Sequence, residues 1–392
     1  MERIKIFKIK IMFKKNKIAL ISYHNAPNYG TMLQAYALYY ALKKLGYESE
    51  YISYDYSLRG WRRYFSIFKN IVLHPSFLFN KLRRKKEKDE FDFFKDREFE
   101  NIINLMNDWY EKYIPHTDVM YNCDTIKQIN YNYDNFIVGS DQTWSPFMSK
   151  TYSSFYFNFL QFVKKNKKKS SYAPSFGTLN LSESYLDKIS YALKSFSNIS
   201  CREKQGAEII SKKLGREVFH VLDPTLLLTP EDWSMVSYPI DMPDKYILCY
   251  ILGERQCISD FAEQLGNKTS LPVYYILTRP FYLSKKNLLS NVGPGEFISL
   301  ISRATYVCTD SFHGTIFSIN FNVPFFSFNK RDKLSLINDN DRMLNILNDF
   351  GLENRFSENT EIVNLDDIDF GDTSEMLLKR RAESISYLNK LI

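Results

Sequence analysis

The chain alternates short apolar segments with longer segments of helical periodicity, and this order constrains its fold more than any other feature. Lys17–Tyr23 has a buried-strand pattern, Thr31–Leu45 carries an apolar face at helical spacing, and Glu50–Tyr54 returns to a strand. The rhythm resumes at Tyr246 with a strand, followed by a helix near Gln256–Leu265 and another strand. Such βαβ units build parallel sheets that are covered by helices. The sequence therefore predicts an α/β fold.

The length of the chain divides this pattern into two domains. With 392 residues, the chain is too long for one ordinary hydrophobic core. We expect a basic tail at 1–16, an N-terminal Rossmann-like domain at 17–225, a linker at 226–245, a C-terminal Rossmann-like domain at 246–372 and a final helix at 373–392. The two domains would face each other across a cleft, with anion-binding groups from both sides.

One part of the first domain departs from the alternating pattern. Residues 59–115 are rich in charged and aromatic side chains and contain no strand signal, which predicts a helical insertion. Aromatic residues next to arginines could form a peripheral contact with a membrane surface. The simpler interpretation is a charged helical pair that packs its phenylalanine face on the domain.

Charge and cysteine content limit the class of protein. The formal net charge of +7 is only mildly basic, which suits anionic small substrates or an acidic membrane surface, and we expect no nucleic-acid partner. The five cysteines are scattered without a CxxC motif, which argues for a reducing compartment and against a zinc site. We find no secretory signal and no run of about 20 apolar residues. We therefore expect a cytoplasmic protein, with the inner face of the membrane as an additional site of action.

One junction between a strand and a helix is the strongest candidate for an active site. Tyr306–Cys308 is a short apolar strand pattern and Phe312–Asn320 has helical spacing, so His313 lies where the helix begins. In an open parallel sheet this edge binds ligands, and the free N–H groups of the first helical turn favour anions. A histidine there could bind phosphate or carboxylate when charged, or transfer a proton when neutral. The alternative is a histidine that only caps the helix.

Two further junctions carry groups that suit a polar substrate. Arg202 lies between a strand at Asn198–Cys201 and a helix at Glu203–Leu214, where its guanidinium could bind a carboxylate or phosphate. A surface salt bridge is the alternative. Ser140–Trp144 follows a strand at Tyr133–Gly139, and its small polar groups and single aromatic ring suit sugar hydroxyls.

Two other loops are weaker candidates for anion binding. Asn28–Gly30 leads into the first helix, and Lys330–Lys333 follows the strand that ends at Phe328. An ordinary helix start and a solvated loop explain these segments about as well. The sequence has no P-loop, GxGxxG, HExxH or GxSxG motif, so local patterns alone do not name a reaction.

Seven short motifs, in order between about Lys17 and Phe328, together resemble the polysaccharide pyruvyl transferase family. The motifs are Asn28-Tyr-Gly-Thr-Met-Leu-Gln34-Ala-Tyr-Ala-Leu, Val138-Gly-Ser-Asp-Gln-Thr-Trp, Ser171-Tyr-Ala-Pro-Ser-Phe-Gly, Cys201-Arg-Glu-Lys-Gln-Gly, Leu222-Asp-Pro-Thr, Gly293-Pro-Gly-Glu-Phe and Asp310-Ser-Phe-His-Gly-Thr. The fold of that family resembles the glycosyltransferase-B arrangement of two Rossmann-like domains. Its characterised members transfer pyruvate from phosphoenolpyruvate to a sugar, forming a ketal on exopolysaccharides, capsules and other cell-surface glycans. The resemblance implies no essential metal, and we expect no cofactor.

The resemblance also implies roles for individual residues. His313 matches the catalytic histidine of the family, and Arg202 matches an arginine that binds phosphoenolpyruvate. In this reaction the enol carbon gains a proton, the sugar hydroxyl loses one and phosphate leaves, so one histidine of near-neutral pKa could act as acid or base. The residues that we expect to bind substrate are Asn28, Gly30, Gln34, Ser140, Asp141, Gln142, Trp144, Arg202, Lys204, Glu296, Asp310, Ser311, Gly314, Thr315, Lys330 and Arg331.

The chain departs from the family pattern at one position. Characterised members often carry an arginine two residues before the histidine, where this chain has Ser311. Either Lys330 or Arg331 replaces that cation, or the donor is not phosphoenolpyruvate. One alternative is a glycosyltransferase that holds a nucleotide-sugar donor near Glu296 and Gly314 and acts on a sugar or lipid-linked oligosaccharide. A second alternative is a non-catalytic glycan-binding member.

Overall fold

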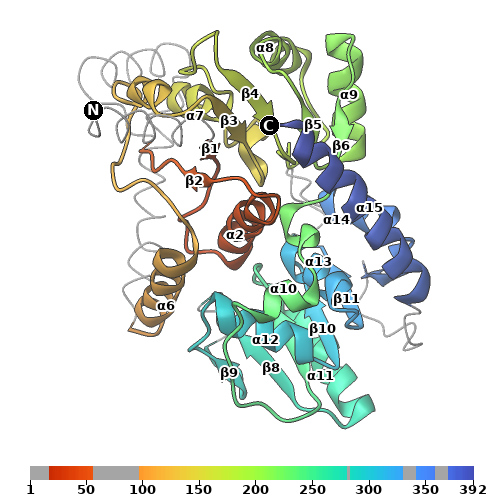
Figure 1. Ribbon diagram of the computed structural model, residues 1–392. Coiled ribbons are helices and arrows are strands. Elements are labelled where there is room, and N and C mark those ends of the chain that lie inside the picture. Colours follow the sequence, from red (N-terminus) through yellow and green to blue (C-terminus); the bar gives the residue numbers. More distant parts are fainter. Residues whose placement is uncertain (1–16, 56–96, 280–282, 330–340, 358–369) are drawn as a thin grey trace, which may run out of the picture.

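The computed structural model describes residues 17–55, 97–279, 283–329, 341–357 and 370–392. They form two α/β units, which lie one above the other in Figure 1. The predicted basic tail and most of the predicted insertion lie outside the described residues.

The N-terminal unit is organised around a four-stranded parallel sheet. Its strands, in spatial order, are β2 (Ser49–Tyr51), β1 (Ile18–Ile21), β3 (Asn135–Val138) and β4 (Lys168–Ser171). Every side chain of the central strand β1 is buried, which explains its uninterrupted apolar sequence. A bridge between Ser170 and Asn198 leads from β4 to a short parallel pair, β5 (Ser200–Cys201) and β6 (Phe219–His220).

The C-terminal unit is organised around a six-stranded parallel sheet. Its strands, in spatial order, are β12 (Phe356–Ser357), β11 (Phe325–Phe328), β10 (Tyr306–Thr309), β7 (Ile247–Tyr250), β8 (Val273–Ile276) and β9 (Leu288–Leu289). The side chains of β7 and β11 are buried along their whole length. The strand–helix alternation and the α/β fold predicted from the sequence are therefore confirmed.

Helices cover both sheets, and their ends follow local backbone chemistry. The main helices are α2 (Tyr29–Lys44), α7 (Tyr152–Asn158), α8 (Glu183–Leu193) and α9 (Lys204–Leu214) in the N-terminal unit, and α11 (Gln256–Thr269), α12 (Pro294–Arg303), α13 (Phe312–Asn320) and α14 (Asp341–Asp349) in the C-terminal unit. Helix α2 begins where the Asn28 side chain accepts a hydrogen bond from the N–H of Thr31. It ends before Gly46, whose φ of 86° lies in the left-handed region that glycine adopts at low cost.

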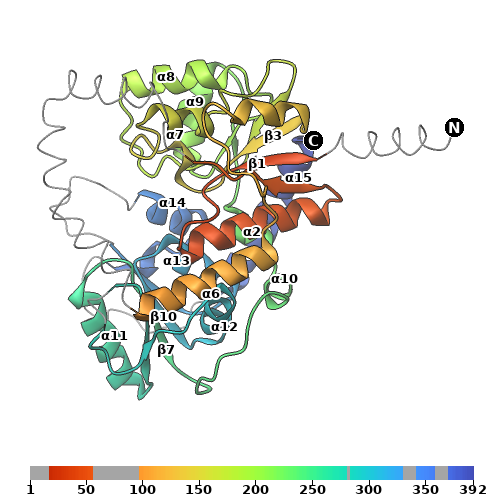
Figure 2. The same cartoon turned by 90° about the vertical axis from the view of Figure 1, so that its left-hand side faces the viewer.

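A hydrophobic core continues from one unit into the other. Helix α2 lies between the two sheets in Figures 1 and 2 and packs against α12. The segment predicted as a linker, 226–245, contributes to this core because Leu226, Leu228 and Trp233 are buried. Its first part forms the short helices η4 (Pro224–Leu227) and α10 (Pro230–Ser234). The two units are thus held together by packed side chains as well as by the connecting segment of the chain.

Two more helices reinforce the junction between the units. Helix α6 (Arg97–Tyr113), the described part of the predicted insertion, lies beside α2 in Figure 2 and contacts both α2 and α12. Helix α15 (Phe370–Lys390) returns to the N-terminal unit, where the Tyr387 hydroxyl donates to the carbonyl of Ser171 at 3.0 Å. Among the described helices, none has the length and apolar character that crossing a membrane requires.

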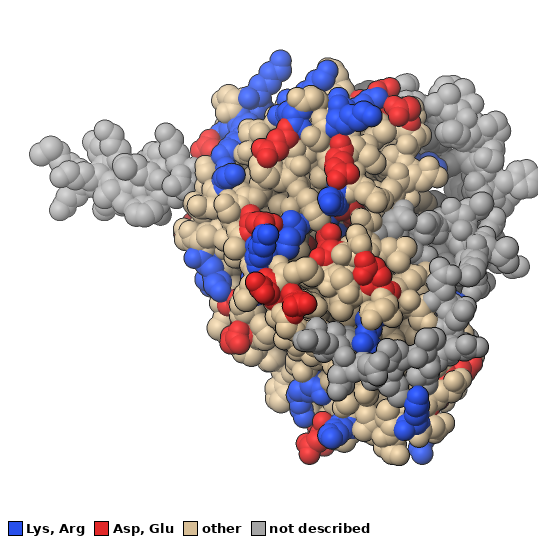
Figure 3. Space-filling view, turned by 90° about the vertical axis from the view of Figure 1, so that its right-hand side faces the viewer, with Lys and Arg blue, Asp and Glu red and all other residues tan. Residues whose placement is uncertain are grey.

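The surface over α9 and α15 carries charged side chains of both signs. Figure 3 shows this face, with basic and acidic residues interspersed among the described residues. The ammonium group of Lys213 lies 2.9 Å from Glu183 and 2.8 Å from Asp187, and Arg380 lies 3.0 Å from Glu383. The positive charge of the chain is therefore locally balanced on this face.

Candidate active site

The start of α13 determines the position of His313. Asp310 accepts hydrogen bonds from the N–H groups of Leu252 and Gly253 at 2.6 and 2.8 Å, which ties the ends of β10 and β7 together. Ser311 is the N-cap of α13, and its hydroxyl accepts from the N–H of Gly314 at 3.4 Å. His313 consequently lies in the first helical turn, at the carboxyl edge of the second sheet.

The imidazole of His313 packs against the first turn of a helix from the other unit. A Cβ atom placed on Gly30 of α2 would lie 2.0 Å from Nδ1 and 2.4 Å from Cγ of His313. Gly30 therefore allows this close approach because it has no side chain. The ring contacts the positive end of the α2 dipole, which favours the neutral imidazole.

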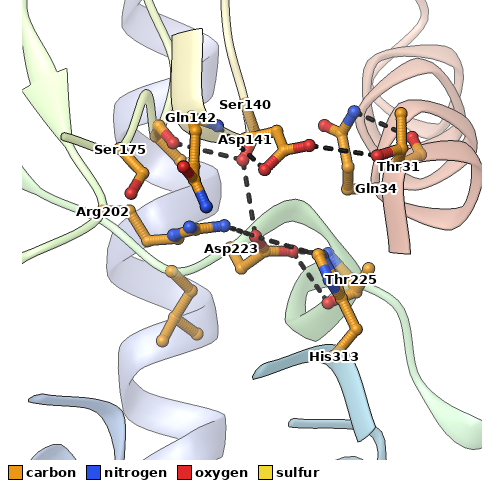
Figure 4. Close-up of polar contacts among 12 residues, drawn as sticks. Thr31, Gln34, Ser140, Asp141, Gln142, Ser175, Arg202, Asp223, Thr225 and His313 are labelled. Carbon is orange, nitrogen blue, oxygen red and sulfur yellow. Dashed lines mark hydrogen bonds and ion pairs between the residues drawn. The ribbon is translucent and has the colours of Figure 1, made fainter. Parts of the chain in front are cut away.

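A buried ion pair lies next to this histidine, between Arg202 and Asp223 (Figure 4). Arg202 directly follows β5, and Asp223 follows β6. Nη1 of Arg202 donates to Oδ2 of Asp223 at 2.7 Å, and the N–H and hydroxyl of Thr225 donate to Oδ1 at 3.1 and 2.8 Å. Asp223 is completely buried and Arg202 is 5% exposed, so the pair interacts with little screening by water.

The same carboxylate faces the histidine. Nε2 of His313 lies 4.0 Å from Oδ2 of Asp223, so Asp223 stands between Arg202 and the imidazole (Figure 4). Within the described residues, Nε2 of His313 and Nη2 of Arg202 are buried and have no hydrogen-bond partner. Buried polar atoms in native proteins nearly always have such a partner. These two nitrogen atoms therefore have unused capacity to form hydrogen bonds within the described part of the chain.

The environment sets the protonation states of the three groups. Burial lowers the pKa of His313, with opposing effects from the carboxylates of Asp223 and Asp141, so the imidazole is neutral at pH 7. Burial alone would raise the pKa of the Asp223 carboxyl, but Arg202 and His313 lower it on balance. The site thus combines an ionised carboxylate, a guanidinium and a neutral imidazole.

Further contacts orient the Arg202 guanidinium. Its central carbon lies 4.3 Å from the centroid of the Phe312 ring, a cation–π arrangement. Its Nε lies 3.6 Å from a carboxylate oxygen of Glu203. Glu203 in turn accepts hydrogen bonds from the Ser175 hydroxyl and, at 3.4 Å, from the N–H of Phe176. The arginine side chain is therefore oriented before any ligand binds.

The loop after β3 completes the site. Asp141 has a φ of 62°, which is rare for a residue other than glycine and is typical of functional sites. Its carboxylate accepts from the Thr31 hydroxyl at 3.1 Å and from the N–H of Gln142 at 2.8 Å (Figure 4). With its amide oxygen toward α14, Gln142 accepts from Nη2 and Nη1 of Arg342 at 2.8 and 2.9 Å. This loop connects the N-terminal sheet to helices from both units.

The structure places several other predicted site residues in structural positions. Trp144, expected to offer its ring to a sugar, is completely buried, donates to the carbonyl of Asn158 and stacks on Phe159. Gln34 is buried and donates to the carbonyls of Tyr23 and Thr31.

Contacts at helix starts and within the sheets account for most of the remaining predicted residues. The Ser140 hydroxyl donates to the carbonyl of Ala173 at 3.1 Å and also lies 3.4 Å from Oδ2 of Asp223, so this predicted residue does reach the site (Figure 4). Asn28 caps α2, and Glu296 accepts from the N–H of Gly293 at the start of α12. Gly314 packs against Thr309, and the Thr315 hydroxyl forms a hydrogen bond with the Ser327 hydroxyl. Lys204 is exposed, and Lys330 and Arg331 lie outside the described residues.

Sequence reasoning did not select three residues that the structure brings to the site. They are Asp223, Thr31 and Arg342. Asp223 lies in the Leu222-Asp-Pro-Thr motif and follows strand β6, just as Arg202 and His313 follow strands β5 and β10. The sequence around Arg342 contains no pattern that would mark it as a site residue. In the described part of the chain, no three His, Cys, Asp or Glu residues gather closely enough to hold a metal ion.

The contact between Gly30 and His313 gives a direct test of the site geometry. We expect Gly30→Ala to reduce turnover by about 100-fold, because the new methyl group must displace the imidazole. Steady-state rates would be measured beside Gly46→Ala, where a Cβ meets open space but the positive φ introduces strain. The control should lose about 1 kcal/mol of stability and keep its turnover. Normal turnover in Gly30→Ala would show that this contact does not position the ring.

A comparison of the sequence with known families gives a match over most of its length. The sequence model of the polysaccharide pyruvyl transferase family matches residues 28–330. This range contains Gly30, Arg202, Asp223 and His313. No curated protein matches the sequence.

Solved structures that are similar to this one include UDP-GlcNAc 2-epimerases and an alpha-glucosyltransferase. UDP-GlcNAc 2-epimerase from Methanocaldococcus jannaschii is 12% identical over 93% of this chain and 91% of its own, with a TM-score of 0.50. The 2-epimerase from Rickettsia bellii is 8% identical over 96% and 98% of the two chains, with a TM-score of 0.44. An alpha-glucosyltransferase solved with UDP and DNA is 10% identical over 95% of each chain, with a TM-score of 0.45. The fold is the glycosyltransferase-B-like arrangement of two Rossmann-like domains.

Proposed function

Because the chain belongs to the polysaccharide pyruvyl transferase family and is a transferase, we propose that it moves pyruvate from phosphoenolpyruvate to a pair of sugar hydroxyls. The product would be a cyclic ketal on a cell-surface polysaccharide or its lipid-linked precursor. The observation that carries this proposal is the buried arrangement of Arg202, Asp223 and His313 at the junction of the two units. This arrangement brings a group that can bind an anion, Arg202, next to a group that can transfer a proton, His313.

The proton balance of the reaction suits a single neutral histidine. When two hydroxyls form a ketal with phosphoenolpyruvate, both lose their protons. One proton goes to the methylene carbon of the enol, and the other leaves with the phosphate as hydrogen phosphate. A group that first accepts a proton and then donates it can therefore serve both halves of the reaction.

His313 has the properties of such a group. It is neutral at pH 7 because burial lowers its pKa, so it can accept a hydroxyl proton first. Oδ2 of Asp223, 4.0 Å from Nε2, stabilises the imidazolium that forms. The charged imidazole can then protonate the enol carbon. We assign proton transfer to Nε2, the buried ring nitrogen without a partner in the described residues.

Arg202 is the group proposed to bind the negative charge of the donor. Although burial acts to lower the pKa of its guanidinium, Asp223 and Glu203 raise it on balance, so it stays charged. Nη2 has no hydrogen bond within the described structure and can donate to a phosphate or carboxylate oxygen. The first turns of α2 and α13 meet at Gly30 and His313, and their N-termini add partial positive charge.

The proposal also implies where the protein acts. Phosphoenolpyruvate is a cytoplasmic metabolite, so we place the reaction in the cytoplasm. An acceptor attached to a lipid would place it at the inner face of the membrane.

Ligand binding and phosphate release test this function. We expect saturating phosphoenolpyruvate to stabilise the protein in a thermal-shift experiment, by about 2.7 kcal/mol at 100 times its Kd. With a panel of surface-polysaccharide oligosaccharides, it should also release phosphate. Stabilisation by a nucleotide sugar without any response to phosphoenolpyruvate would instead identify a glycosyltransferase. Glycan binding without phosphate release from any donor would identify a non-catalytic protein.

A further inference from the structure

Two guanidinium groups from different units lie over the same aromatic ring. The central carbon of Arg202 lies 4.3 Å from the centroid of Phe312, and that of Arg342 lies 5.7 Å from it. Arg202 follows β5 of the N-terminal unit, whereas Arg342 lies in the first turn of α14 of the C-terminal unit. Two like charges this close repel each other unless negative charge lies nearby. Asp223 and Glu203 already lie beside Arg202, and two guanidinium groups around one ring can also bind the oxygens of a ligand that is itself negatively charged.

The present partner of Arg342 shows how such a ligand would bind. The side-chain oxygen of Gln142 accepts from both Nη1 and Nη2 at 2.9 and 2.8 Å. Both N–H groups donate to one oxygen here, whereas a carboxylate or phosphate offers two oxygens, which a guanidinium binds through two parallel hydrogen bonds. Because Gln142 is neutral, a charged oxygen of a ligand would be a stronger acceptor for the same two N–H groups.

Two further observations point to an anion at this place. Gly30 in the first turn of α2 lies against His313, and the guanidinium groups of Arg202, just before α9, and Arg342, in the first turn of α14, lie over the ring of Phe312. In addition, Nη2 of Arg202 is buried without a hydrogen-bond partner in the described part of the chain, and the Arg202 side chain is 3% exposed. A buried donor of this kind calls for a partner, and an oxygen of a bound anion would supply one.

We propose that Arg342 binds an anionic group of the donor substrate and forms, with Arg202, a two-arginine site that spans both units. This inference rests on the proposed transfer from phosphoenolpyruvate, whose phosphate and carboxylate are two anionic groups on one small molecule. One group would contact Arg202 and the other Arg342, next to the imidazole of His313. Arg342 then supplies the second cation that this chain lacks at Ser311, which the sequence suggested at Lys330 or Arg331.

The proposed site predicts a preference for donors with two anionic groups. A ligand with a single anionic group can engage either arginine but cannot bridge the two units. A ligand with two such groups can contact an arginine of each unit at the same time. It would thereby hold the two units together around His313. Binding of the donor to both Arg202 and Arg342 would therefore also position the donor next to the His313 imidazole.

Titration calorimetry with phosphoenolpyruvate tests this assignment on three variants of the full-length chain. We expect Arg342→Gln to raise the Kd by about tenfold or more, because a charge-assisted two-pronged contact is lost. Gln142→Glu should weaken binding in the same direction, since its carboxylate competes with the ligand for Arg342. Arg303→Gln, at the far end of α12, removes the same charge away from the site and should leave the Kd within about twofold. Inorganic phosphate and pyruvate as probes then show which group Arg342 contacts.

The outcomes separate this inference from the proposed function. If the wild-type protein binds phosphoenolpyruvate and Arg342→Gln binds it equally well, Arg342 is not part of the donor site, although the proposed donor stands. If the wild-type protein does not bind phosphoenolpyruvate but binds a nucleotide sugar, the proposed donor is wrong. In that case a loss of nucleotide-sugar affinity in Arg342→Gln still supports Arg342 as an anion-binding residue, and unchanged affinity overturns it.

Discussion

Replacing His313 with glutamine is expected to reduce turnover by about 10²- to 10⁴-fold while phosphoenolpyruvate still binds. Glutamine fills a similar volume and can form hydrogen bonds, but it cannot accept and return a proton near pH 7. The substitution therefore removes the proton transfer that ketal formation needs and leaves the anion-binding groups Arg202 and Arg342 in place. Single-turnover rates of phosphate release, measured with saturating donor and acceptor, give the effect on the chemical step.

A second histidine variant serves as the control. His116 lies in the loop after α6, where its Nδ1 contacts the carbonyl of Ile114 at 2.8 Å, and it does not contact Arg202, Asp223 or His313. His116→Gln should leave turnover within about twofold. The wild-type rate should also hold down to a pH below 6.5, because burial lowers the pKa of His313 and the imidazole remains neutral there. Full activity of His313→Gln would remove this residue from the mechanism.

The parts of the fold that the sequence predicted are those with a strong local signal. Helix α13 (Phe312–Asn320) has the boundaries expected from its spacing, because a serine caps its start and a proline soon follows its end. The two-residue edge strands β9 and β12 were not predicted, since two residues carry no periodicity. The sequence predicted 226–245 only as a linker, and the complete burial of Trp233 within it was not predicted.

The site was predictable to the extent that it follows strand ends. His313 and Arg202 were selected from strand–helix junctions, and the structure brings both to the same carboxylate. Asp223 could not be recognised as that carboxylate, because an Asp-Pro-Thr sequence is equally typical of a helix cap and its partner His313 is far away along the chain. For Trp144, only packing against Phe159 decides that the ring lies in the core rather than at the surface.

Breaking the Arg202–Asp223 pair is expected to have the largest effect on stability. Asp223→Asn leaves a buried guanidinium without its main counter-charge, and Arg202→Met leaves a buried carboxylate, so each should lower the free energy of unfolding by about 3–5 kcal/mol. The double variant removes both charges and should be more stable than the sum of the two losses predicts. Urea denaturation of the wild type, the two single variants and the double variant measures the coupling energy between Arg202 and Asp223.

Activity should not follow stability in this cycle, and that difference separates a catalytic site from a structural ion pair. If Asp223 stabilises the His313 imidazolium and Arg202 binds the donor, the double variant stays inactive even where its stability recovers. Glu183→Gln, which breaks the exposed pair with Lys213, is the matched control and should change stability by less than about 1 kcal/mol with normal turnover. If the double variant regains turnover together with stability, Arg202 and Asp223 stabilise the junction between the units and have no role in the reaction. A double variant that is stable and inactive would instead support the view that a buried ion pair is retained here for the chemistry it provides.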